Sequence, residues 1–403
     1  MKILFITAEG FDTPNPNNQM AETMIGEFLN NGYQVHLIQS HRKGVNSDIP
    51  DSLINREKFV CDTVTRKVVD KSNFVKRYFN DFKYAFSAMK YWRKVKDADV
   101  VYLQSNPTII YPMLLLRLFY RKPIVYSIYD IFPGHAYDIG VIRSKFIFNA
   151  LKLLQKPCYK IADVITVLSE DMREELINIG VKSDKIKVVP AWYDIKNTHE
   201  IARRDNLFIK KYNIPENKFY VQFAGSLGYI FNYKTVLALA KEIKEKTDIV
   251  IQIVGDGPIK ETFIKEAEES GLKNIDFYPL QPVELVPHVY SACDLCVIPL
   301  KKSVIRNAVP SKAPILMACR RTIVNSVEIN SKYASAFHKY NMGISVDIED
   351  VRGLADAVIY LYENPEILKK MADNANEYGK THYSSTKSIR LIMNIFDKWG
   401  KNN

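Results

Sequence analysis

The sequence predicts an α/β protein with two domains, each built around a parallel sheet. At 403 residues the chain is too long for one ordinary hydrophobic core, so two domains are expected. Short apolar runs alternate with helical patterns along its length, which is typical of doubly wound folds. The clearest region is Tyr220–Ser331, where each apolar run ends in Gly, Pro or a polar turn. We expect these strand ends to border a ligand crevice.

Composition restricts the function classes without choosing one. Hydrophobic residues make up 47% of the chain and charged residues 25%, as in soluble globular proteins. The formal net charge of +11 favours an anionic partner, either nucleic acid, an acidic membrane surface or a phosphorylated substrate. No nucleic-acid-binding module is recognisable, so that partner is not expected. No apolar run approaches 18 residues and no signal peptide is expected.

The cysteines and one acidic motif have structural interpretations. Five scattered cysteines, an odd number, indicate a reducing cytoplasm rather than a disulfide framework. Cys293 and Cys296 form an isolated C-x-x-C, which we interpret as two small buried residues. Asp97 and Asp99 precede a strand and form the only D-x-D. We interpret them as strand-entry residues and expect no metal site.

The first domain is expected to open with a βαβ unit. A polar loop, Glu9 to Asn18, separates the first strand from a helix that ends at Gly32. The loop lacks G-x-G-x-x-G, so it is not a dinucleotide fingerprint. The strands expected in this half are Lys2–Thr7, Gln34–Gln39, Val100–Ser105, Ile124–Tyr129, Val164–Leu168 and Ile186–Pro190.

A basic, aromatic segment lies inside this first half. The segment from Arg66 to Lys96 contains ten basic residues and two acidic ones, and aromatic residues are interleaved among them. Phe74, Tyr78, Phe82, Phe86 and Met89 recur at helical spacing and form one apolar face. The helix either packs this face into the core or lies on anionic lipid head groups, and both can hold for one helix.

The second half repeats the strand-and-helix rhythm after a polar segment. Asp194–Lys218 is polar, carries alternating charges and is interpreted as a linker. We therefore place domains at 1–195 and 196–380, followed by a helical segment, 381–403. The strands expected are Tyr220–Ala224, Ile249–Val254, Ile275–Tyr278, Leu295–Pro299, Thr322–Asn325 and Gly343–Ile348. Helices are expected at Val351–Tyr362, Pro365–Tyr378 and about Ser385–Trp399.

Two glycine turns follow the first two strands of the second domain. They are Gly225-Ser226-Leu227-Gly228 and Gly255-Asp256-Gly257. Glycine lets backbone N–H groups approach a phosphate or a base without an intervening Cβ. These turns favour a nucleotide-sugar site.

Several segments in this order resemble the GT-B glycosyltransferases of family GT4. The pieces are FAGSLG (Phe223–Gly228), VGDGP (Val254–Pro258), YPLQP (Tyr278–Pro282), ACDLCVIPL (Ala292–Leu300), VPSKAPILMA (Val309–Ala318), YDIFP (Tyr129–Pro133), ADVITVLSEDM (Ala162–Met172) and KVVPAWYD (Lys187–Asp194). The resemblance covers essentially the whole chain. It is closest to the bacterial branch that builds capsular, exopolysaccharide and O-antigen repeat units.

The resemblance implies two Rossmann-like domains facing a cleft, with the last helix crossing back to the first domain. It implies an acceptor on the N-terminal domain and a nucleotide-sugar donor on the C-terminal one. Family members retain anomeric configuration and need no metal, so no cofactor is expected beyond the substrate.

Candidate site residues follow from the chemistry and the matching motifs. A leaving diphosphate needs N–H groups and cations, so we assign it Lys312 and Arg306, with Ser311 at a helix start. Gly255, Asp256, Gly257 and Gln281 match positions that border the base, and Asp256 could equally cap a helix. On the acceptor side the matching residues are Asn17, Asn18, Asp130 and His135. For His135 a loop position without catalytic role is favoured.

The chain also departs from the family pattern. Ile315 stands where the second glutamate of E-x7-E would bind ribose, and Asn307 stands near the first. Ser226 follows Gly225 where a cation is usual, so that Lys234 is the nearest one, and Tyr129 replaces a strand histidine.

The leading hypothesis is a cytoplasmic hexosyl- or N-acetylhexosaminyltransferase, peripheral on the inner face of the membrane. It would use a UDP-sugar and a lipid-diphosphate-linked saccharide, and would contact anionic lipid through residues 66–96. One alternative is a non-catalytic GT-B partner subunit of another glycosyltransferase. The other is a GT-B sugar-nucleotide epimerase, which needs more cleft carboxylates and histidines than the sequence offers.

Overall fold

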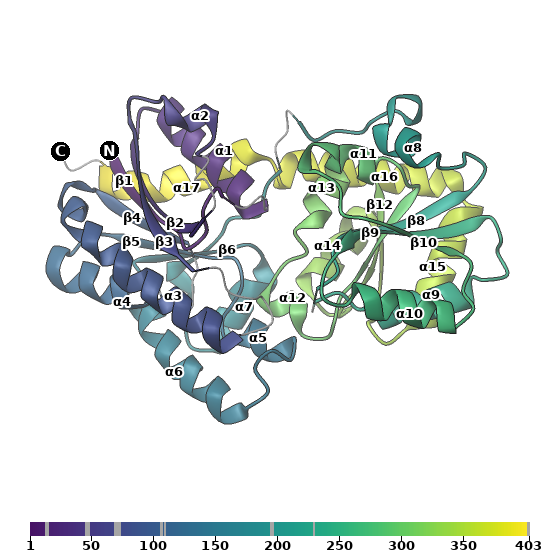
Figure 1. The fold of residues 1–403 in the computed structure, drawn as a ribbon, viewed down its shortest axis with the longest axis horizontal. Helices are drawn as coiled ribbons and strands as arrows, with labels where there is room; N and C mark the ends of the chain where they lie inside the picture. The colour runs from purple at the N-terminus through teal and green to yellow at the C-terminus, as the bar shows by residue number, and fades with distance from the viewer. Residues whose placement is uncertain are drawn as a thin grey trace. The chain divides into compact units, whose positions relative to one another are not determined.

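The chain folds into two compact α/β units. The computed structural model describes residues 1–12, 16–44, 49–67, 74–104, 108, 110–193, 197–228 and 230–400. Unit 1 comprises Met1–Ala191, Asn307–Val309 and Ser385–Asn403, and unit 2 comprises Trp192–Arg306 and Pro310–Ser384 (Figure 1). The sequence analysis placed the first boundary after residue 195 and the second after residue 380.

Unit 1 is built on a parallel seven-stranded sheet with the order β3-β2-β1-β4-β5-β6-β7. Its strands are β1 (Lys2–Ile6), β2 (Gln34–Arg42), β3 (Phe59–Arg66), β4 (Val100–Gln104), β5 (Ile124–Ile128), β6 (Val164–Val167) and β7 (Ile186–Val188). The central strands are apolar on both faces, because helices cover both sides of the sheet. The order reverses between β1 and β4, and the carboxyl ends beside such a reversal commonly bind ligands.

The sequence analysis missed β3. This strand pairs with β2 from Val35↔Phe59 to Arg42↔Arg66. It is an edge strand, and Val64 is its one fully buried residue, so it lacks the apolar run that marked the inner strands. Its Val and Thr residues fit a half-buried strand.

Helices flank this sheet. They are α1 (Pro16–Asn30), α2 (Asp51–Ile54), α3 (Phe74–Ala88), α4 (Ile110–Leu115), α5 (Gly134–Asp138), α6 (Lys145–Ile161), α7 (Glu170–Asn178) and α17 (Ser385–Gly400), with shorter turns η1 (Met89–Asp97), η2 (Leu116–Tyr120) and η3 (Ser183–Lys185). Figure 1 shows α1, α2 and α17 on one side of the sheet and α3, α4 and α6 on the other.

The last helix, α17, belongs to unit 1. The ring of Phe396 lies 5.5 Å from Phe28 of α1 and 6.1 Å from Tyr102 of β4, measured between centroids. Ser388 Oγ donates a hydrogen bond of 2.9 Å to the Pro190 carbonyl. Burying a phenylalanine of this kind contributes about 2–3 kcal/mol, so these contacts hold the chain's end on the first unit.

The basic segment differs from the expected single amphipathic helix. It forms α3 followed by the 3₁₀ segment η1. The buried residues of α3 include Tyr84, Ala85 and Ala88, whereas Phe86, placed on the expected apolar face, is 48% exposed. Phe74 is among the residues whose side chains the structure does not describe. The small residues Ala85 and Ala88 allow close packing, so the aromatic stripe does not supply the buried face.

Unit 2 is built on a parallel six-stranded sheet with the order β10-β9-β8-β11-β12-β13. Its strands are β8 (Phe219–Ser226), β9 (Ile249–Asp256), β10 (Ile275–Tyr278), β11 (Leu295–Pro299), β12 (Thr322–Ser326) and β13 (Gly343–Val346). The order reverses between β8 and β11. All six expected strands are present, and the predicted α/β class with two doubly wound sheets is confirmed.

Helices separate the strands of unit 2. They are α8 (Leu207–Tyr212), α9 (Tyr233–Glu242), α10 (Lys260–Glu269), α11 (Val286–Tyr290), α12 (Val304–Asn307), α13 (Lys312–Ala318), α14 (Lys332–Tyr340), α15 (Val351–Glu363) and α16 (Pro365–His382), with turns η4 (Arg203–Asp205) and η5 (Val283–Leu285).

The interpretation of Asp194–Lys218 as a linker is wrong for its second part. Helix α8 lies there, and Phe208 and Ile209 are buried in unit 2. Asn206 caps α8 by accepting from Phe208 N and Ile209 N, and it donates to the His288 carbonyl at 2.7 Å. The helix is only six residues long and lies in a polar segment, so its apolar residues were not recognised as a helix.

The acidic pair and the cysteine pair have structural partners. Lys2 N donates to Asp99 Oδ2 at 2.7 Å, and Lys2 Nζ lies 3.8 Å from Asp97. Cys293 and Cys296 are buried free thiols with their sulfur atoms 3.4 Å apart. Both motifs therefore match the structural interpretation.

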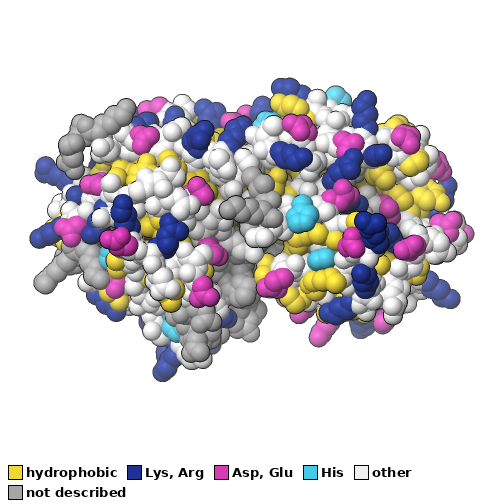
Figure 2. All heavy atoms as spheres, turned by 90° about the horizontal axis from the view of Figure 1, so that it is seen from above, with side chains coloured by type: hydrophobic (Ala, Val, Ile, Leu, Met, Phe, Trp, Pro, Cys, Tyr) yellow, Lys and Arg dark blue, Asp and Glu magenta, His cyan; other side chains and the backbone are white. Residues whose placement is uncertain are grey.

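Surface charge is mixed on the face seen in Figure 2, where Lys and Arg alternate with Asp and Glu. Over the described parts of the chain, every helix is too short or too polar to cross a bilayer.

Candidate functional site

Two glycine turns lie side by side at the carboxyl ends of β8 and β9. The parallel register pairs Gly225 with Gly255 and Ser226 with Asp256. A Cβ on Gly255 would lie 2.0 Å from the Gly225 carbonyl oxygen, so this position requires glycine. Gly225 and Gly257 have φ values of +133° and +155°, which L side chains rarely adopt. The two turns therefore place backbone groups at the carboxyl ends of strands beside the position where the strand order reverses.

Lys312 lies against the first of these turns. Its Nζ is 3.6 Å from the centroid of the Phe223 ring, and a Cβ on Gly225 would lie 3.2 Å from the same nitrogen. Burial lowers the pKa of Lys312 to about 7. The ammonium is thus held by an aromatic face and is poorly solvated, an arrangement that an incoming anion would stabilise.

Three further predicted residues, Gly228, Ser226 and Ser311, lie near Lys312 and the first glycine turn. Gly228 lies at the end of the first turn, where a Cβ would be 3.2 Å from Ser226 Oγ. Ser226 is exposed beside it. Ser311 precedes α13 as its N-cap but makes no side-chain capping bond, which leaves its hydroxyl exposed.

Other predicted residues in unit 2 have structural partners or lie on the surface. Gln281 accepts from Lys211 Nζ at 3.1 Å and donates to Tyr212 OH at 2.9 Å, so its amide is held by α8. Asp256 accepts from Gly257 N at 2.9 Å; it fixes the turn and is not the N-cap of α10, which is Ile259. Arg306 is exposed on α12.

Lys234 is directed elsewhere. It pairs with Glu266 of α10, and this hydrogen bond raises the pKa of the Lys234 ammonium. The cation at the glycine turn is therefore Lys312, which lies 87 residues after Gly225 in the chain.

Sequence reasoning missed a buried carboxylate in unit 2. Glu328 follows β12, and its Oε1 accepts from the backbone N–H of Ser303. Its Oε2 is buried and has no hydrogen-bond partner. A polar residue directly after a strand end was the available signal. A free acceptor oxygen here could take a hydroxyl donor.

Asn17 and Asn18 do not occupy a turn with positive φ. Both lie in the first turn of α1, which begins at Pro16. Asn18 Nδ2 donates to the Gly10 carbonyl at 2.7 Å, and Asn17 Nδ2 lies 3.4 Å from Glu9 Oε2. The two asparagines anchor the loop after β1, because proline at the helix start sets the helical conformation.

Asp130 and His135 lie after β5. Asp130 is exposed and forms an antiparallel bridge with Ala308. His135 lies on the short helix α5, and its Nδ1 is buried without a hydrogen-bond partner. The hydroxyl of Tyr129 is buried, and burial raises the pKa of this phenol.

Asn307 is fixed beside this segment. Its carbonyl accepts from Ile131 N at 2.9 Å, and its Nδ2 donates to Asp138 Oδ2 at 2.6 Å. The side chain is almost fully buried at 1% exposure, yet Oδ1 has no hydrogen-bond partner. Gly134 allows this approach, because a Cβ there would lie 2.7 Å from Oδ1.

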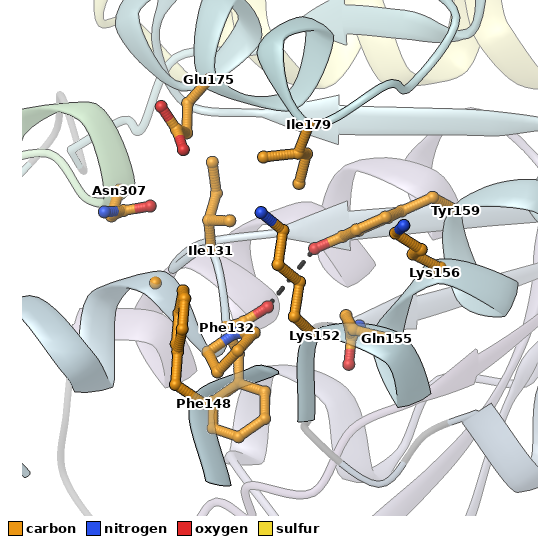
Figure 3. Close-up of a pocket in the computed structure, with 12 residues that line it drawn as sticks. Ile131, Phe132, Phe148, Lys152, Gln155, Lys156, Tyr159, Glu175, Ile179 and Asn307 are labelled. Carbon is orange, nitrogen blue, oxygen red and sulfur yellow. Dashed lines mark hydrogen bonds between the residues drawn. The ribbon is translucent and has the colours of Figure 1, made fainter. Parts of the chain in front are cut away.

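A pocket in unit 1 opens in front of Asn307. The pocket is shallow and open to solvent, so only a small part of its space is enclosed by protein. Helix α6 contributes Phe148, Lys152, Gln155, Lys156 and Tyr159, and α7 contributes Glu175 and Ile179. Figure 3 shows Lys152 reaching across the pocket and Asn307 pointing its oxygen into it. Aromatic walls with a few polar groups suit a polar ring compound such as a sugar.

Neither Asp130 nor His135 lines this pocket. The sequence analysis named Asn307 only as a departure from the family pattern. It did not expect α6 or α7 to contribute, because residues so far apart in sequence meet only in the folded sheet. Among the residues with a described placement, no three His, Cys, Asp or Glu side chains gather to hold a metal ion.

Comparisons with protein families match both halves of the chain. Residues 18–197 match the family described as Glycosyltransferase Family 4. Residues 205–378 match the family described as Glycosyl transferases group 1. The two matches together cover both sheets except β1, and all candidate residues except Asn17.

Two relatives and many solved structures are similar to the chain. It is 25% identical to the glycosyltransferase WbjE of Pseudomonas aeruginosa over 66% of the chain and 67% of that protein. It is 22% identical to the glycosyl transferase WcaI of Escherichia coli (strain K12), named for colanic acid biosynthesis, over 58% of the chain and 56% of that protein.

The solved structures show the fold. Sucrose-phosphate synthase from Thermosynechococcus elongatus superposes with a TM-score of 0.76 at 14% identity, covering all of both chains. Anabaena Alr3699/HepE, solved with UDP-glucose, gives 0.72 at 15% identity, covering 99% of this chain and 100% of that one.

Proposed function

We propose a donor and an acceptor class for this chain, which belongs to the family GT4 glycosyltransferases of the GT-B fold. The chain is a glycosyltransferase. The proposed reaction moves a hexosyl or N-acetylhexosaminyl group from a UDP-sugar to a lipid-linked saccharide in surface polysaccharide synthesis.

Lys312 beside Gly225 is the observation that carries the proposal. The leaving nucleoside diphosphate develops negative charge as the glycosidic bond breaks. A desolvated cation 3.6 Å from the Phe223 ring, next to a turn of backbone N–H groups, can stabilise that charge. Because its pKa is about 7, Lys312 becomes fully charged when the diphosphate arrives.

A uridine nucleotide and a polysaccharide role are proposed from the relatives. HepE was solved with UDP-glucose, and WcaI is named for colanic acid biosynthesis.

The pocket in unit 1 is proposed to hold the acceptor saccharide. Asn307 Oδ1 can accept from a sugar hydroxyl, Lys152 can donate, and Phe148 offers an apolar face. The lipid part of the acceptor would lie at an anionic membrane surface, reached by residues 66–96, on the cytoplasmic side. Co-purification tests whether the chain has a partner glycosyltransferase.

Retention and metal independence complete the proposal. Lys312 supplies a cation on the donor side, so the diphosphate need not rely on a divalent ion there. Transfer should then continue in the presence of EDTA.

The test is a panel of UDP-, GDP- and TDP-sugars presented to the purified protein. We expect a thermal shift and slow hydrolysis with one UDP-sugar, unchanged by EDTA, and retention in the product by NMR. No shift and no hydrolysis with any of the nucleotides would contradict the proposal. A response to GDP or TDP alone would correct the base.

A further inference from the structure

Helix α6 carries two apolar faces, and one of them faces solvent. Leu151, Cys158 and Tyr159 are buried toward the sheet. Phe146, Ile147, Leu153 and Leu154 are 83%, 49%, 63% and 48% exposed. Their spacing of one, seven and eight residues places all four on one outer stripe of the helix. A solvent-facing helix normally carries polar residues there.

Neighbouring helices extend the stripe. Helix α4 packs against α6 and against α3. Leu118 of η2 is 72% exposed and Phe79 of α3 is 61% exposed. Helices α3, α4 and α6 cover the same side of the sheet (Figure 1). We call Phe79, Leu118 and the four α6 residues the outer apolar surface. Large apolar residues exposed together on one side of a helix, as the four of α6 are, mark an interaction site.

Basic residues outnumber acidic ones around this surface, and the nearby acids Asp81 and Asp163 are paired with Arg66 and Arg117. Helix α6 contains four lysines, Lys145, Lys152, Lys156 and Lys160, and no Asp or Glu. The segment from Ile110 to Tyr120 also has no acid. Protein–protein interfaces are depleted in lysine, whereas helices that lie on anionic bilayers combine lysine with Phe and Leu.

We propose that the outer apolar surface docks on a bilayer with anionic head groups, with α6 as its main element. Phe146, Leu153 and Leu154 enter the boundary between head groups and acyl chains, and the exposed Lys145 and Lys160 at the two ends of α6 meet lipid phosphates. This goes beyond contact through residues 66–96, because it assigns docking mainly to a helix outside that segment.

Docking would place the pocket close to the lipid. Helix α6 turns Phe148, Lys152 and Lys156 toward the pocket and its outer stripe toward solvent. A lipid-linked acceptor could then reach the pocket without leaving the membrane. This consequence rests on the proposed function, whereas the docking itself does not.

The test is sedimentation of the full-length protein with vesicles. Phosphatidylglycerol–phosphatidylcholine vesicles are compared with pure phosphatidylcholine at low and high salt. The test variant is F146S/L153S/L154S, and the matched control is L207S/V283S/Y360S, whose residues are 50%, 40% and 45% exposed in unit 2. We expect the wild type and the control to bind anionic vesicles, and the α6 variant to lose affinity by about tenfold or more.

Tryptophan fluorescence and UDP affinity are measured as well, to distinguish the possible outcomes. F146W should show a fluorescence blue shift on adding anionic vesicles, and L207W should not. Equal vesicle binding by the α6 variant, or an α6-dependent dimer without vesicle binding, would overturn the proposal. Unchanged UDP affinity in the α6 variant separates the two claims: docking without any nucleotide binding would contradict only the proposed function.

Discussion

The two sheets present different kinds of surface at their carboxyl ends. In unit 2 the candidate donor site is made of backbone, at two glycine turns held in register by β8 and β9, with one lysine added. In unit 1 the pocket is made of side chains from α6, α7 and Asn307. Substitutions that add atoms at the glycine turns should therefore disrupt the unit 2 site. In the unit 1 pocket, each side chain should contribute separately to ligand binding.

The largest expected effect is on the backbone-built site. Gly255→Ala places a Cβ 2.0 Å from the Gly225 carbonyl and should lower the free energy of unfolding by about 3 kcal/mol or more. Gly26→Ala is the matched control, because nothing lies within 4 Å of its Cβ position in α1. It should be neutral or stabilising by up to about 1 kcal/mol. Urea denaturation followed by circular dichroism measures both; equal stabilities would contradict the comparison.

The next effect concerns the cation. Lys312→Met should weaken UDP binding by about 10–100-fold, the loss of one charge-assisted hydrogen bond, while Lys241→Met, on the exposed side of α9, should change nothing. Calorimetric titration measures both affinities. Unaltered binding by Lys312→Met would remove the lysine from the site.

The pH dependence of the free energy of unfolding gives a second test of Lys312→Met. The pKa of Lys312 is lowered on folding, so the unfolded chain binds the extra proton between about pH 7 and 10.5. The free energy of unfolding of the wild type should therefore rise across that window. Lys312→Met should lack this rise and be no less stable at pH 7. A destabilised variant would indicate a structural role instead.

A smaller effect is expected in unit 1. Asn307→Ala should raise the KM for the acceptor by about tenfold, the value of one hydrogen bond, and leave UDP affinity unchanged. Asp138→Ala removes the bond to Asn307 Nδ2 without touching the pocket's free oxygen. If both variants act equally on KM, Asn307 works only by holding the local backbone.

The same contrast explains what the sequence could predict. The glycine turns are local patterns at strand ends, so their positions could be predicted, whereas the pairing of Gly225 with Gly255 is given by the strand order of the structure. The fold class followed in the same way from alternating apolar runs and helical patterns. Edge strand β3 was missed because it is only slightly buried. Helix α8 was missed because its burial is confined to two residues.

The side-chain-built site could not be predicted in the same way. Asn307 meets Asp138 across 169 residues, and the pocket brings Asn307 together with side chains of α6 and α7. Asn17 and Asn18 were placed in a loop because their role as anchors depends on Gly10. The outer stripe of α6 has the same spacing as a buried one, and the pattern alone does not say which face the sheet covers.

The most direct test is proton uptake on UDP binding. Above pH 7 the free Lys312 amine is mostly neutral, and a bound diphosphate favours the ammonium, so binding should take up close to one proton near pH 8. Titration calorimetry in buffers of different ionisation enthalpy measures this number. Affinity should fall as pH rises above 7, and Lys312→Met should show neither effect. UDP binding with no proton uptake, or uptake that persists in Lys312→Met, would contradict the assignment of Lys312 to the diphosphate.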